Sequence, residues 1–72
     1  MSVGVTLTQK DLEAIRELYF KRWTAEISNW KEPNTDYCLW FVHCPNKTGA
    51  LITETGNSLA ETIDKLLQRA LE

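Results

Sequence analysis

The thiols and the imidazole of this chain, which could act as a nucleophile, a base or metal ligands, all lie between positions 38 and 44. Cys38 and Cys44 carry thiols, and His43 carries the only imidazole. Neighbours in a β-strand point to opposite faces, so His43 and Cys44 cannot form a nucleophile–base pair. The spacing also lacks the tight C-x₂₋₄-C turn that usually opens a zinc site. The sequence therefore predicts a non-enzymatic protein with no catalytic residue, no metal and no cofactor.

The two thiols are predicted to be free and buried. Cys38 and Cys44 are separated by about 20 Å in one extended strand, whereas a disulfide needs Cα atoms within about 7 Å. The N-terminal residues lack the basic start and long apolar centre of a secretory signal, and no apolar run approaches the ~20 residues that span a bilayer. These features predict a cytoplasmic protein with no membrane partner.

The segment 37–44, Tyr-Cys-Leu-Trp-Phe-Val-His-Cys, is predicted to be the central strand. It holds no formally charged side chain, no glycine and no proline, and it is rich in aromatic and β-branched residues. Alternation places Tyr37, Leu39, Phe41 and His43 on one face and the other four residues on the opposite face. Because both faces are apolar, this strand needs a cover on each side.

A more polar segment at 50–55 is predicted to be the returning strand of a hairpin. Residues 45–49, Pro-Asn-Lys-Thr-Gly, end in a glycine that suits the turn. This turn places Trp40 opposite Glu54. A carboxylate beside a covered tryptophan would need a lysine or arginine partner. Otherwise, Glu54 marks the open end of the sheet.

Two amphipathic helices are predicted to flank the hairpin. The first is expected at about residues 9–28 with Thr8 as its N-cap, and the second at about 59–71. The apolar face of the first helix would contain Leu12, Ile15, Tyr19, Trp23 and Ile27. The prediction is a single α+β domain over residues 1–72, in the order αββα.

Trp30 falls outside these elements, in a connection that ends with the turn cluster at 33–36. A tryptophan in a short polar connection either folds back onto the core or stays exposed as an anchor for a partner. Both alternatives stay open, so Trp30 is a candidate interface residue.

The charge of the chain decides whether a nucleic acid or a protein is the expected partner. Aromatic strands can stack bases, and Tyr37, Trp40 and Phe41 would supply the rings. However, the eight basic and ten acidic residues are interleaved and give a net charge of −2, with no basic stripe along any element. A nucleic-acid-binding regulator is therefore the alternative function, and a protein is the expected partner.

The placement of the helices decides whether the central strand is also a binding surface. If both helices pack on one face of the hairpin, the other face is an exposed apolar patch of the kind that marks an interface. A second copy could also pair with the hairpin and complete a four-stranded sheet. If each helix covers one face, the sheet is only a core. The first arrangement makes Tyr37, Trp40, Phe41 and Trp30 the candidate protein interface.

A resemblance to known small proteins covers about residues 37–71. The hairpin is followed by Gly56-Asn57-Ser58-Leu59-Ala60-Glu61-Thr62-Ile63. This arrangement resembles prophage and phage accessory proteins, in which an aromatic hairpin leads through G-x-[ST]-L-A-E-A-I into a closing helix. Thr62 stands where alanine is usual. The outline is also similar to HicB-type antitoxin domains, which lack the long first helix, so no functional residue carries over. The expectation is a phage-type inhibitor or adaptor that binds a host or phage protein and forms homo-oligomers.

Overall fold

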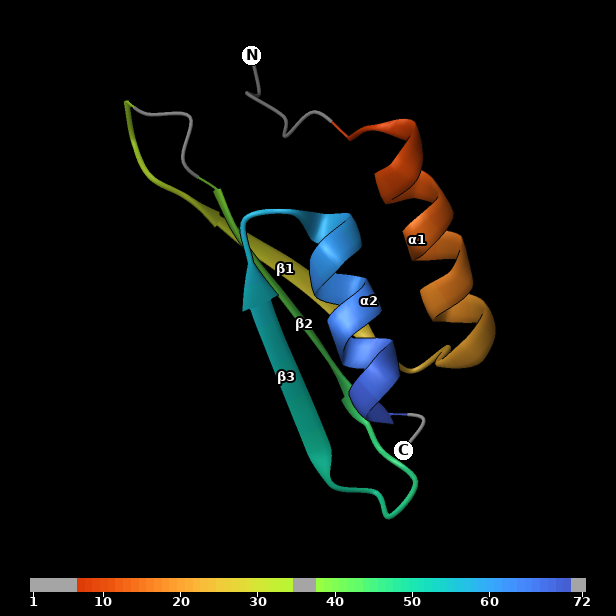
Figure 1. Ribbon diagram of the computed structural model, residues 1–72. Helices are drawn as coiled ribbons and strands as arrows, with labels where there is room; N and C mark the ends of the chain where they lie inside the picture. The colour runs from red at the N-terminus through yellow and green to blue at the C-terminus, as the bar shows by residue number, and fades with distance from the viewer. Residues whose placement is uncertain (1–6, 35–37, 71–72) are drawn as a thin grey trace.

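The computed structural model describes residues 7–34 and 38–70, which form two helices and three strands in the order α1–β1–β2–β3–α2. The elements are α1 (Gln9–Lys21), β1 (Glu26–Lys31), β2 (Cys38–Pro45), β3 (Leu51–Gly56) and α2 (Leu59–Ala70). The strands form one antiparallel sheet in the order β1-β2-β3, with β2 at its centre (Figure 1). The predicted α+β class is confirmed, and the sheet has one strand more than predicted.

The predicted first helix is too long, because its last part is a strand. α1 ends before Arg22, which leaves the helical region with φ −141° and ψ 72°. Trp23, expected on the core face, lies in the following turn and is 81% exposed. Ile27 belongs to β1 and pairs with Val42 of β2. Residues 26–31 are extended and not helical because their backbone N–H and C=O groups then form hydrogen bonds with β2. This pairing also covers one edge of the apolar strand β2.

Trp30 also belongs to β1, where it pairs with Leu39, and not to a loop as predicted. The turn that follows β1 is in its expected place, with Asn34 at a positive φ of 65°. Asparagine adopts this left-handed conformation more readily than most residues. A polar segment without strong strand character is thus extended because its neighbour β2 offers a pairing edge.

β2 and β3 form the predicted hairpin with a register that differs by two residues. Trp40 pairs with Gly56, whereas the sequence predicted Glu54 opposite it. The turn is closed by Asn46, whose Oδ1 accepts a hydrogen bond from the Ala50 N–H at 3.0 Å. The loop therefore begins one residue later than predicted. A shift of two leaves every side chain on its predicted face of the sheet.

Both helices lie on the same face of the sheet. α2 packs on β2 and β3, and α1 packs against α2 (Figure 1). The core lies between the helices and this face, and Ile27, Trp40 and Ile52 pack against it from the strands. Its buried residues are Leu18, Ala25, Val42, Cys44, Leu59, Ile63, Leu66, Leu67 and Ala70. The structure thus answers the question that the sequence left open.

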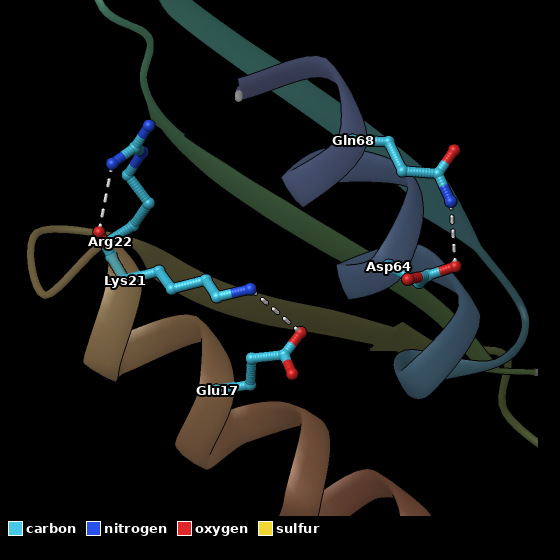
Figure 2. Close-up of polar contacts among 5 residues, drawn as sticks. All are labelled: Glu17, Lys21, Arg22, Asp64 and Gln68. Atoms are coloured by element: carbon cyan, nitrogen blue, oxygen red, sulfur yellow. Dashed lines mark hydrogen bonds and ion pairs between the residues drawn. The ribbon is translucent and has the colours of Figure 1, made fainter. Parts of the chain in front are cut away.

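The solvent sides of the two helices carry polar pairs one turn apart. Lys21 Nζ lies 3.8 Å from Glu17 Oε1, and Gln68 Nε2 donates to Asp64 Oδ2 at 3.1 Å (Figure 2). Figure 2 also shows the Arg22 guanidinium donating to the Lys21 carbonyl oxygen, at 3.0 Å. Such exposed pairs contribute a few tenths of a kcal/mol each, so the apolar faces hold the helices in place. In the described part of the chain, neither helix has the length and apolar character needed to cross a membrane.

Candidate functional site

The face of the sheet that turns away from the helices is not covered by any element of the described residues. Strand alternation and the pairing register define which side chains lie on it. We call it the open face. Its residues are Glu26, Ser28 and Trp30 of β1, Leu39, Phe41, His43 and Pro45 of β2, and Leu51, Thr53 and Thr55 of β3.

The apolar residues of the open face form a diagonal stripe. At one end Trp30 of β1 pairs with Leu39 of β2, and Phe41 follows on the same face. At the other end Pro45 of β2 pairs with Leu51 of β3. Trp30 is 50% exposed and Leu51 is 65% exposed. These five residues, which we call the apolar stripe, extend from one edge strand to the other, with His43 between Phe41 and Pro45 on β2.

The rest of the open face is polar but almost free of formal charge. Glu26 is the one formally charged residue among the described residues of this face. Its Oε2 lies 2.7 Å from His43 Nε2, so the imidazole N–H donates to the carboxylate across the β1–β2 pair. Ser28 and Thr55 lie on either side of Phe41. The apolar stripe is therefore bordered by short hydroxyl side chains.

Trp40 lies on the helix-covered face and does not share a surface with Phe41 or Trp30. It packs against the core and lines a pocket of about 340 Å³ at the start of both helices, with Lys10 and Cys38 among its other lining residues. Amide groups at these helix ends already donate to the Asp11 carboxylate. The backbone amides of Thr8 and Ala60 are therefore not free to bind a ligand in this pocket.

Two of the four predicted interface residues are brought together by the fold. Trp30 and Phe41 lie on the open face, in neighbouring strands. Tyr37 lies outside the described residues. The sequence did not single out Leu51 as an interface residue, although side-chain alternation in the predicted hairpin already placed it on the same face as Phe41. Trp30 could not be assigned to this face because β1 was not predicted.

The thiols and the imidazole lie on opposite faces, as strand alternation predicts. Cys44 is fully buried in the core, whereas Cys38 is partly exposed and its Sγ accepts from Asn29 Nδ2 at 3.6 Å. Burial raises the pKa of the Cys44 thiol, and the positive charge of Arg22 offsets part of that rise. A thiol that stays protonated inside the core is a packing group and a poor nucleophile.

The open face combines features that protein interfaces share. It carries an apolar stripe that His43 interrupts, it is nearly free of formal charge, and it includes a partly exposed tryptophan. Comparisons with protein-family models, with curated proteins and with solved structures find no match. The description of the open face therefore rests on the geometry of this chain alone.

Proposed function

We propose that the protein is a small non-enzymatic phage-type protein that binds another protein through its open face, as an inhibitor or adaptor. The observation that supports this is the position of both helices on one side of the sheet, which leaves Trp30 and Leu51 exposed and Leu39 and Phe41 only half-buried. Covering apolar surface is favourable by about 25 cal/mol per Å². An uncovered apolar patch on a small soluble domain is therefore typical of a docking surface.

The charge of the open face favours a protein over a nucleic acid. Its described residues include no lysine and no arginine, and its formal charge is the carboxylate of Glu26. Surfaces that stack bases normally place basic side chains beside their aromatic rings to contact phosphates. A partner with an uncharged apolar surface suits this face better.

Self-association is kept in the proposal as a weaker use of the open face, secondary to a partner protein. A four-stranded or larger sheet would instead require pairing along an outer edge. On β3 that edge is partly covered, because Arg69 Nη1 donates to the Thr53 carbonyl oxygen at 3.3 Å and also pairs with Glu54. Covering an edge with a charged side chain is a common way to prevent strand addition. We place the protein in the cytoplasm, which suits its free thiols.

The test compares two phenylalanines on different surfaces. The full chain, the Phe41→Glu variant and the Phe20→Glu variant are used to capture a partner from host lysate, and the affinity for the identified partner is then measured by calorimetry. Phe20 is 89% exposed on α1 and serves as the control; because Phe41 is half-buried, circular dichroism first establishes that both variants are folded. We expect Phe41→Glu to weaken binding by at least ~30-fold, the effect of a hot-spot residue, with Phe20→Glu unchanged. The opposite ranking would refute the proposal.

A further inference from the structure

The apolar stripe has the dimensions of one α-helix. Six residue steps separate Leu39 from Pro45, which corresponds to about 20 Å along β2, with the polar His43 between Phe41 and Pro45. A helix of about 13 residues has the same length. The stripe is one side chain wide at Phe41, where Ser28 and Thr55 border it on the two neighbouring strands. An amphipathic helix presents a similarly narrow apolar line between polar flanks.

The covered face of the same sheet shows what these strands accommodate. α2, with 12 residues, packs on β2 and β3 through a single apolar side. The residues of that side are Leu59, Ile63, Leu66, Leu67 and Ala70. Because both faces of a sheet share the same strand spacing and length, a helix of similar length fits the open face. Its addition would turn a two-layer arrangement into three layers, with helices on both sides of the sheet.

A second copy stacked sheet on sheet fits the open face less well. Stacking would cover the hydroxyl groups of Ser28, Thr53 and Thr55 against another sheet, and burying a hydroxyl without a partner is costly. The footprint is also small, about 20 Å by 10 Å between the outer strand axes, whereas a stable dimer buries about 800 Å² per partner. A single helix would lay its apolar line along the stripe and bring its polar flanks, which can form hydrogen bonds, beside the hydroxyl groups.

The charge of the open face adds a second requirement. Glu26 lies on the β1 side of the face, beside His43, and its side chain is 74% exposed. A basic residue on the flank of a docked helix would reach this carboxylate, whereas an acidic residue there would be repelled. The β3 side of the face offers Thr53 and Thr55 instead, which impose no charge.

We infer that the occupant of the open face is an amphipathic α-helix of a partner protein, with a narrow apolar stripe and basic residues on the flank beside Glu26. This inference rests on the proposed function, because it names the chemistry of the partner for the same face. The apolar stripe supplies the affinity, and the single carboxylate sets which way round the helix lies.

A selection from random peptides tests the inference with the full chain as the only bait. Linear 16-residue peptides displayed on phage are selected against the full chain, after depletion on the Phe41→Glu variant. We expect the selected peptides to carry apolar residues at i, i+3 or i+4, and i+7, to be enriched in lysine and arginine, and to gain helical circular dichroism on binding. Leu51→Glu is expected to weaken the peptides at least ~10-fold, Glu26→Gln about 3-fold, and Phe20→Glu not at all.

The outcomes separate the inference from the proposed function. Selected peptides that alternate apolar and polar residues, or that stay non-helical when bound, would overturn the helical occupant and leave the protein-binding function in place. A dimer in sedimentation that Leu51→Glu dissociates and the peptides do not would make a second copy the occupant, and would also overturn the inference. A natural partner that binds Phe41→Glu as tightly as the full chain refutes the proposed function and the inference together.

Discussion

Asp11 in the first turn of α1 accepts a hydrogen bond from the backbone N–H of Ala60 at the start of α2, at 3.2 Å. Its other carboxylate oxygen accepts from the N–H of Thr8, at 3.0 Å, in a capping box. One carboxylate thus serves the N-terminal ends of both helices, where the helix dipoles favour negative charge. At the opposite ends, Arg22 Nη2 donates to the Ala70 carbonyl oxygen at 3.1 Å. The two helices are therefore parallel and joined at both ends.

Replacing Asp11 by alanine is expected to lower the free energy of unfolding by about 1–2 kcal/mol, because amides at both helix starts lose their acceptor. The measurement is urea unfolding followed by circular dichroism. Asp64→Ala is the matched control, since Asp64 is an exposed acidic residue whose carboxylate accepts from Gln68 on its own helix. The control is expected to cost less than about 0.5 kcal/mol. Equal losses in the two variants would contradict a capping role for both helices.

Position 56 requires glycine because a side chain there would clash with Thr62. A Cβ atom at position 56 would lie 2.6 Å from Thr62 Oγ1, and the Thr62 hydroxyl is buried and donates to the Ser58 carbonyl oxygen at 2.6 Å. Gly56→Ala is therefore expected to cost about 1–3 kcal/mol through overpacking. Thr62→Ala removes the obstacle, and in that background Gly56→Ala should cost at least about 1 kcal/mol less. Additive losses in this double-mutant cycle, measured by urea unfolding, would rule out the clash.

The sequence specified the two helix starts and the faces of β2, because these depend on local chemistry. Thr8 with Asp11 is a capping box that can be recognised from residue types alone, and it is present. Alternation along β2 is independent of its neighbours. β1 was not predicted because Trp23 and Ile27 have a spacing that also fits a helix. The competing pairing of Ile27 with Val42 is a long-range contact that local pattern does not reveal.

The open face could be predicted only in part for a related reason. Both faces of β2 are apolar, so its sequence does not tell which face the helices cover. Alternation puts Trp40 and Phe41 on opposite faces, and the placement of the helices puts Trp40 against the core and Phe41 on the open face. Trp30 joins Phe41 only through β1. The candidate site thus depends on the tertiary arrangement more than on any local motif.

The buried thiol of Cys44 makes stability depend on alkaline pH. Burial raises its pKa above the ordinary value of 9.0 in the folded protein, so above that pH the unfolded thiol releases its proton while the folded one keeps it. Stability from this group is complete below about pH 9 and is lost as the pH rises further. We expect Cys44→Val to lose less stability than the unmodified chain between about pH 8 and pH 10. Urea unfolding at each pH measures this.

Cys38 provides the control for that pH dependence. It is partly exposed and lies in the same strand, so Cys38→Val should keep the alkaline loss of the unmodified chain. Identical pH dependence in all three proteins would show that burial of the Cys44 thiol does not contribute.

Arg69 is expected to keep the outer edge of β3 from pairing with another chain. Its guanidinium donates to the Thr53 carbonyl oxygen and pairs with Glu54, whose side chain is only 19% exposed. Arg69→Ala would expose that edge carbonyl and leave the carboxylate without its cation, so we expect stability to fall by about 1 kcal/mol and self-association to increase. Sedimentation velocity over a range of concentrations measures the association. Lys65→Ala, an exposed cation on the same helix, is expected to behave as the unmodified chain does. If Arg69→Ala also sediments like the unmodified chain, the edge is protected by its short length and not by Arg69.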